Sequence, residues 1–284
     1  MTGAVSIDRV TPFIGAEVSG VDMSQPLGNE TFAILHDALV EHGVLFFRDQ
    51  DITPAQHKDF ASRFGHLQVH PFAPNLGEDH PEIIVIEHGE KRAPDLNNWH
   101  TDVTFMAQPP LGSVLHAKVM PDTGGDTMWA SMYAAYEALS DRMQRLLGEL
   151  MAIHDYEHVF GKAGRLYRNQ GADKMEAERR KHPPAEHPVI RTHPVTGRHG
   201  IFVNSSFTVR IKDMKQKESD ALLTFLHEHI KLPEFQCRFR WRANSVAFWD
   251  NRCTQHYAIA DYFPHHRKLH RVTIDGDTPV FRPN

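Results

Sequence analysis

The chain consists of many short apolar runs separated by polar turns, with a few longer segments of helical spacing. Helices are predicted at 30–42, from Thr53-Pro54 onward, near 133–139 and 142–150, and at 217–230. Thr53 can cap its helix and Pro54 suits the first turn. The expected strands are a pair within 4–21, then 44–47, 83–86, 113–119, 126–129, 188–192, 200–203, 208–211, 237–241, 246–249, 255–258 and 270–274.

Strands dominate this pattern, and helices do not alternate with them regularly. That order argues against a doubly wound sheet or an eight-fold α/β barrel, and favours a mainly β fold with flanking α-helices, a sandwich or jelly-roll barrel. The 284 residues can form one sizeable core, so we expect a single domain over 1–284. Residues 158–181 are polar, charged and interrupted by glycine, which predicts a lid or surface excursion.

Composition narrows the function classes. The formal net charge is −5, and there is no Lys/Arg run typical of a nucleic-acid or anionic-membrane surface. No apolar stretch approaches the roughly 20 residues of a membrane span, and the N-terminus shows no signal peptide. Two cysteines, Cys237 and Cys253, fit a reducing cytoplasm. The 21 histidines direct attention to metal binding.

A His-x-Asp pair, His100 and Asp102, lies in an aromatic, β-prone stretch. In a strand, residues i and i+2 share a face, so the imidazole and the carboxylate could bind one ion. Similar pairs occur at 57–59, 80–82 and 88–90, but these lie in a helical pattern, a proline-containing loop and a glycine turn. The alternative interpretation of His100 is a loop histidine paired with a carboxylate.

A third ligand is expected from a distant strand, and His256 begins an apolar alternation late in the chain. Two histidines and one carboxylate form the facial triad that suits iron(II) and leaves positions open for a keto acid and O2. A structural zinc site would usually contain more cysteines. Arg267 and Arg271 follow on one predicted strand, and a guanidinium binds carboxylate or sulfonate oxygens at two points.

These motifs resemble the TauD/TfdA-type iron/2-oxoglutarate dioxygenases, and the taurine dioxygenase branch most. The similarity runs nearly end to end. It covers residues 14–22, Trp99-His100-Thr101-Asp102-Val103-Thr104-Phe105, Gly124-Gly125-Asp126-Thr127, Phe202-Val203-Asn204, Trp249-Asp250-Asn251-Arg252 and Thr254-Gln255-His256-Tyr257-Ala258.

The resemblance implies a double-stranded β-helix with iron(II) bound by His100, Asp102 and His256. It places 2-oxoglutarate on Thr127 and Arg267. It also implies hydroxylation of a small organic acid with O2, releasing succinate and CO2, and a hydroxylated sulfonate would then fragment to sulfite and an aldehyde. The family is commonly oligomeric, so a homodimer or tetramer is expected. The residues implied to lie near the substrate are His70, Val103, Phe160, Phe207 and Arg271.

The chain departs from the taurine pattern at Ala73, Leu96 and Val159, where Tyr, Asn and Ser are usual. Each change removes a hydrogen-bonding group, so a buried ammonium would lose its partners. Our hypothesis is therefore an apolar-tailed or aromatic sulfonate, sulfate ester or carboxylate substrate, and residues 131–133 and 159–161 resemble the phenoxypropionate-cleaving branch. Two alternatives stay open: a cupin-like metal-binding sensor, and a divalent-metal hydrolase on the same barrel.

Overall fold

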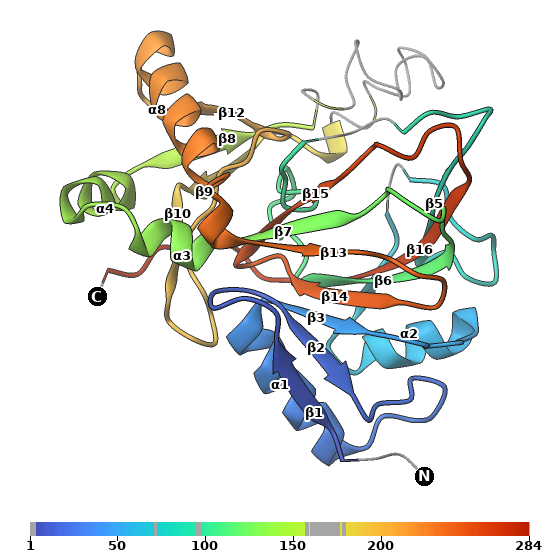
Figure 1. Ribbon diagram of the computed structural model, residues 1–284. Helices are drawn as coiled ribbons and strands as arrows, with labels where there is room; N and C mark the ends of the chain where they lie inside the picture. The colour runs from blue at the N-terminus through green and yellow to red at the C-terminus, as the bar shows by residue number, and fades with distance from the viewer. Residues whose placement is uncertain are drawn as a thin grey trace.

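Two β-sheets packed against each other form the centre of the computed structural model, which describes residues 4–70, 73–94, 98–156, 159, 177 and 180–283 (Figure 1). The larger sheet has the order β1-β2-β3-β14-β6-β16-β4, with β5 also paired to β16, and the smaller has the order β13-β7-β15. The larger sheet comprises β1 (Ser6–Arg9), β2 (Ala16–Ser19), β3 (Val44–Phe47), β4 (Leu67–Gln68), β5 (Ile83–His88), β6 (Gly112–Val119), β14 (Val246–Asp250) and β16 (Arg267–Ile274). The smaller comprises β7 (Thr127–Ser131), β13 (Gln236–Phe239) and β15 (Thr254–Ala258).

The central strands of the larger sheet are apolar on both faces because each face packs on a different layer. In β3, Leu45 and Phe47 pack toward the helices, whereas Val44 and Phe46 pack between the sheets. The inner layer is aromatic: the Phe46 ring stacks on Phe239 with centroids 4.2 Å apart and meets Trp129 edge-on. Successive side chains of the strand point to opposite faces, and neither face meets solvent. Every position in the run is therefore apolar.

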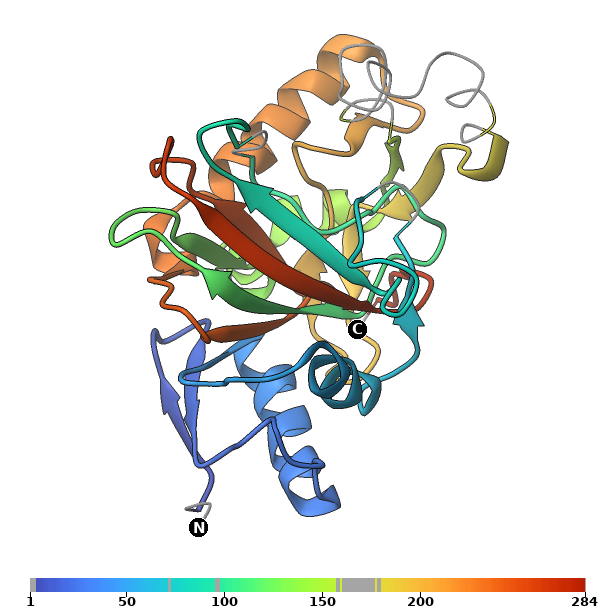
Figure 2. The same cartoon turned by 90° about the vertical axis from the view of Figure 1, so that its right-hand side faces the viewer.

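Helices α1 (Asn29–His42) and α2 (Pro54–Ser62) cover the outer face of the larger sheet, as both views show (Figures 1 and 2). Thr53 and Gln56 form a reciprocal capping box at the start of α2. Gly43 ends α1 with φ of 71°, a left-handed conformation that glycine adopts without steric cost.

A second group of elements lies on the side away from α1 and α2 (Figures 1 and 2). It is built around a separate apolar cluster that includes Leu147, Ile201 and Leu226. Its elements are α3 (Met132–Glu137), α4 (Asp141–Gly148), β8 (Met151–His154), β9 (Ala185–Pro188), β10 (Ile190–Thr192), β11 (His199–Ile201), β12 (Thr208–Ile211), α8 (Gln216–His229) and the 3-10 helix η1 (Pro233–Phe235).

Most of the predicted elements are confirmed, and the exceptions are local. The strand predicted at 188–192 is two strands, β9 and β10, and both β4 and β8 were missed. The predicted excursion at 158–181 lies almost entirely outside the described residues. Both cysteines are free and buried, and none of the described helices has the length and apolarity that a membrane crossing requires.

Three histidines, His57, His116 and His270, are buried between α2 and the larger sheet. His57 Nε2 bonds the carbonyl oxygen of Val114 at 3.0 Å, while its Nδ1 has no partner among the described residues. Burial, reinforced by His116, lowers the pKa of His57 to about 3, and burial with Lys118 lowers the pKa of His116 to about 4. These imidazoles are therefore neutral near pH 7.

This cluster predicts acid-dependent stability. Because the folded pKa of His57 lies below its unfolded value of 6.5, the unfolded chain binds more protons, and stability falls as pH drops below 6.5. The His57 contribution to that slope should approach about 1.4 kcal/mol per pH unit. His57→Gln should flatten the curve of unfolding free energy against pH, measured by urea denaturation between pH 7.5 and 4.5. Parallel curves for the variant and the original protein would contradict this.

Candidate metal centre

An isolated antiparallel bridge joins His100 to His256, two residues far apart in the chain. His100 N donates to His256 O at 3.0 Å, and His256 N donates to His100 O at 2.8 Å. The two imidazole centroids are consequently only 4.1 Å apart. Thr101 Oγ1 also donates to the carbonyl oxygen of Thr254 at 2.9 Å, which adds a side-chain contact between the same two segments.

The Asp102 carboxylate completes this group of donors. His100 Nε2 and His256 Nε2 each lie 3.9 Å from Asp102 Oδ1. One donor atom from each of the three residues lies within 4.8 Å of the others. Two imidazole nitrogens and a carboxylate oxygen on one side of a shared point form the donor set that accepts a divalent transition metal and leaves coordination positions open.

The prediction that His100 and Asp102 lie on one strand is wrong. His100 makes only the isolated bridge, and Asp102 begins a turn. The next residue, Val103, has φ of 41°, which is unusual for a β-branched side chain. The turn, rather than a strand face, directs the carboxylate toward the imidazoles. Such a conformation persists only where the surroundings hold it.

Polar contacts surround both oxygens of Asp102. Arg271 Nη1 donates to Oδ1 at 2.7 Å, and Ser113 Oγ donates to Oδ2 at 3.0 Å. Burial alone would raise the pKa of Asp102, but the charge of Arg271 and the neighbouring histidines hold it well below its usual range. The carboxyl group is therefore ionised near pH 7, as a metal ligand must be.

The imidazoles are also in a ligating state. Burial lowers the pKa values of His100 and His256, which keeps both rings neutral near pH 7. His100 Nδ1 bonds the carbonyl oxygen of Asn98 at 2.9 Å, which places the proton on Nδ1 and leaves the Nε2 lone pair facing Asp102. A second bond of this kind commonly fixes the tautomer of a metal-binding histidine.

The buried Arg267 lies against the Gly124-Gly125 turn. Its Nε donates to Gly125 O at 3.1 Å, and the turn leads directly into Thr127 at the start of β7. Gly125 has φ of 71°, and a Cβ there would lie 3.0 Å from Arg267 Cδ, so the close approach requires glycine. None of the ion pairs formed among the described residues includes Arg267.

An apolar cluster lies next to Asp102. It contains Val103, Phe105, Tyr156 and Phe207, with Met106 and Val159 packed against it. Three residues predicted from the sequence, Val103, Val159 and Phe207, are thus brought together. Phe105 and Tyr156 were missed because an aromatic residue in a turn gives no periodic signal.

Of the remaining residues predicted near the substrate, some lie close together and others lie outside the described part of the chain. Ala73 N donates to His70 Nδ1 at 3.0 Å, so these two residues are in contact. Burial, with the charge of Arg271, lowers the pKa of His70 to about 4. Leu96 and Phe160 lie outside the described residues. Ser113 was missed because a lone serine at the start of a strand carries no motif.

Comparisons with known proteins decide the family. The sequence pattern described as "Taurine catabolism dioxygenase TauD, TfdA family" matches residues 6–273. The chain belongs to the TauD/TfdA family. It is 36% identical to an alkylsulfatase of Acinetobacter baylyi over 97% of this chain and 86% of that protein. It is also 36% identical to an alpha-ketoglutarate-dependent sulfate ester dioxygenase of Pseudomonas putida, over 97% and 91%.

Solved structures agree with this assignment. A taurine dioxygenase from Burkholderia xenovorans superposes with a TM-score of 0.83 at 35% identity, over 98% of this chain and 93% of that one. The predicted jelly-roll fold is therefore confirmed. This TauD/TfdA protein is a 2-oxoglutarate-dependent dioxygenase, so family membership argues against both the sensor and the hydrolase alternatives.

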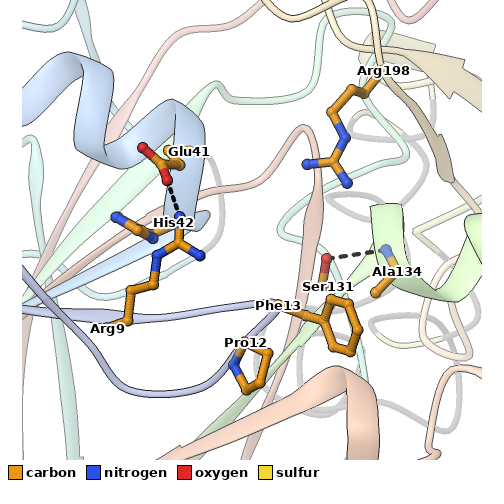
Figure 3. Close-up of a pocket in the computed structure, with 8 residues that line it drawn as sticks. All are labelled: Arg9, Pro12, Phe13, Glu41, His42, Ser131, Ala134 and Arg198. Atoms are coloured by element: carbon orange, nitrogen blue, oxygen red, sulfur yellow. Dashed lines mark hydrogen bonds and ion pairs between the residues drawn. The ribbon is translucent and has the colours of Figure 1, made fainter.

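Polar side chains also gather at two other places in the dioxygenase. A cavity of about 230 Å³ lies among Arg9, His42, Ser131 and Arg198 (Figure 3). Arg9 pairs with Glu41 there, and Ser131 Oγ accepts from Ala134 N, so its polar groups largely satisfy one another. The second feature is a buried group of His193, Asp250 and Cys253. Burial raises the pKa of the Cys253 thiol, which keeps it protonated near pH 7, and Arg252 and His193 already bond the Asp250 carboxylate. This group therefore lacks the ionised thiol that a metal ligand requires.

The geometry predicts which group binds the metal. His100→Ala should lower affinity for a divalent metal by more than the roughly 10–100-fold typical of losing an outer-shell contact, because it removes a direct ligand. Cys253→Ala, in the other cluster, should keep the original affinity. Metal content after dialysis and titration with Fe(II) or Mn(II) measure both. Equal metal binding by His100→Ala and the unmodified chain would exclude the triad.

Proposed function

We propose that this dioxygenase binds iron(II) on His100, Asp102 and His256 and hydroxylates the carbon bonded to the acid group of an apolar-tailed sulfate ester. The observation that carries the proposal is the position of the apolar cluster, which begins at Val103, the residue after the proposed ligand Asp102. With 2-oxoglutarate and O2 bound, iron would supply the oxidising power for C–H cleavage.

Arg267 and Thr127 would hold the far carboxylate of 2-oxoglutarate. Burial lowers the pKa of Arg267, and only Tyr262 and more distant acidic groups oppose that effect. A buried guanidinium without a carboxylate is costly, whereas a bound dicarboxylate would supply the missing charge. Thr127 Oγ1 accepts from Trp241 Nε1 at 3.0 Å, which leaves its hydroxyl proton available to a ligand carboxylate.

Arg271 and His70 would recognise the acid group of the substrate. Arg271 Nε is buried and has no partner within the described part of the chain. His70 Nδ1 accepts the Ala73 amide proton, so the neutral ring carries its proton on Nε2 and can donate it. One guanidinium and one neutral donor suit a monoanionic sulfate or sulfonate.

The rest of the pocket suits a hydrocarbon. Val103, Phe207 and Val159 offer no hydrogen bond to an ammonium, and Ala73 lacks a polar side chain. Two relatives at 36% identity are described as an alkylsulfatase and a sulfate ester dioxygenase. Both points favour an alkyl sulfate over taurine.

The reaction balances without a further reagent. One oxygen atom of O2 enters succinate as 2-oxoglutarate loses CO2, and the other becomes a hydroxyl group on the carbon bonded to the sulfate oxygen. That carbon–oxygen bond then breaks, and the products are an aldehyde and hydrogen sulfate. The protein's part is to hold this carbon near the metal and to exclude water.

The first test concerns 2-oxoglutarate. Arg267→Gln should raise the KM for 2-oxoglutarate, because a buried charge-assisted contact of about 1.5–3 kcal/mol is lost. The KM for the sulfate substrate should change little. Steady-state succinate formation at varied 2-oxoglutarate gives the first value. Lys212→Gln, which removes a surface ion pair with Glu186, is the matched control. An unchanged KM for 2-oxoglutarate would remove Arg267 from this role.

The second test concerns the substrate. Succinate formation, which all these substrates share, should be fastest with medium-chain alkyl sulfates, slower with alkyl sulfonates and aryloxyalkanoates, and slowest with taurine. Sulfate should be released only from the alkyl sulfates. Phe207→Ala should raise the KM for a long alkyl sulfate more than for a short one, because it removes apolar contact with the tail. Efficient turnover of taurine alone would overturn the substrate assignment and leave the metal site intact.

A further inference from the structure

The loop between β11 and β12, Val203–Phe207, bonds the neighbours of all three proposed metal ligands. Gln255, which precedes His256, donates from Nε2 to Val203 O at 2.7 Å. Ser205 Oγ donates to the carbonyl oxygen of Trp99, which precedes His100, at 2.9 Å. This segment is called the bridging loop below.

The third contact comes from Asn204, which is 1% exposed. Asn204 Nδ2 donates to Thr104 Oγ1 at 3.0 Å, and Thr104 follows Asp102 by two residues. The same hydroxyl bonds His154 Nδ1 at 2.9 Å, and the Thr104 carbonyl oxygen bonds His187 Nε2 at 2.9 Å. Thr104 is therefore held from three directions, immediately after the left-handed Val103.

Asn204 also fixes the far end of its own loop. Its Oδ1 accepts from Ser206 N at 3.1 Å and from Phe207 N at 2.9 Å. Phe207 then enters the apolar cluster, with its ring centroid 5.3 Å from that of Phe105. The Asn204 side chain thus connects two parts of the site. Its amide nitrogen bonds the turn that contains Asp102, and its oxygen bonds the segment that contains Phe207.

We infer that the bridging loop sets the distance between the metal and the substrate pocket, and that Asn204 is its positioning residue. The inference rests on the proposed function, in which the substrate tail lies against Phe207. Asn204 touches neither metal nor substrate in this scheme. Its role is to keep Thr104 and Phe207 in one fixed relation, so that the reacting carbon stays within reach of the oxidant.

The reaction depends on the fixed positions of Thr104 and Phe207 relative to each other. Consumption of 2-oxoglutarate needs the metal, O2 and the residues that hold the keto acid, whereas product formation also needs a correctly placed C–H bond. A displacement of about 1 Å can lower the rate of a reaction by about 100-fold. Loosening the loop should therefore lower hydroxylation while succinate formation continues, in an assay that contains ascorbate as the two-electron reductant that consumes the oxidising equivalent no C–H bond takes up.

Asn204→Ala tests this directly. Aldehyde formed per succinate should fall well below the original value, and the kcat for aldehyde should fall about 10- to 100-fold, with an unchanged KM for 2-oxoglutarate. The control is Ser219→Ala. The buried Ser219 hydroxyl, on α8, accepts a hydrogen bond at 2.8 Å from the backbone nitrogen of Ile211, which ends β12. This variant should lose similar stability and keep the original product ratio.

Thr104 supplies a second pair of variants, which decide the matter if Asn204→Ala does not fold. Thr104→Val keeps the shape and removes the hydroxyl, so it should uncouple the reaction, and Thr104→Ser should restore most of the coupling. In the Co(II)-substituted protein, the visible absorption that reports ligand geometry should shift in Asn204→Ala and Thr104→Val and not in Ser219→Ala.

Three results would contradict either the role of the bridging loop or the proposed substrate class. Product ratios and Co(II) spectra equal to those of Ser219→Ala would overturn the inference. An equal fall in succinate and aldehyde would also overturn it, because that result indicates only general damage. If the unmodified protein forms succinate but oxidises none of the tested acids, the proposed substrate class fails, while the Co(II) spectra still test the loop.

Discussion

The pairing of two backbone amides and two carbonyl oxygens between His100 and His256 is the constraint on which the site depends. A metal site requires its donors to lie close together, and chain entropy opposes bringing distant segments together. Here strand β15 supplies one residue of the bridge and an irregular segment supplies the other. The backbone hydrogen bonds typical of antiparallel strands thus join these two residues although one of them lies outside any strand. The imidazoles lie close together because the hydrogen bonds hold their backbones side by side.

Charge is the second organising feature. Arg267 and Arg271 lie on β16, four residues apart and therefore on one face, and both are largely buried. Arg271 pairs with Asp102, whereas Arg267 meets a carbonyl oxygen and the Tyr262 ring. Buried cations are retained where anions are bound, because the cost of removing them from water is offset only when a partner arrives. In the proposed scheme, the strand would thus provide two separate places for acids beside one metal.

The sequence predicted much of this structure because most elements have a regular period. The run Val44–Phe47 and the capped helix at Pro54 appear as expected. Periodicity could not reveal the turn at Asp102, since its direction depends on a left-handed Val103 and on contacts with the distant Asn204. The donors were identified by residue type and family resemblance. The strand expected around His256 is confirmed, whereas the one expected around His100 and Asp102 was wrong. Contacts such as Ser113 with Asp102 leave no trace in local sequence.

The left-handed conformation of Val103 has a consequence for evolution of the pocket. A β-branched residue at φ of 41° stores conformational energy on the order of 1–3 kcal/mol. A glycine there would relieve that energy, yet it would remove a buried apolar side chain worth a similar amount and free the turn that aims the Asp102 carboxylate. Backbone conformation and pocket wall are therefore tied together at this one position, whereas Phe207 and Val159 can change the shape of the pocket without changing that turn.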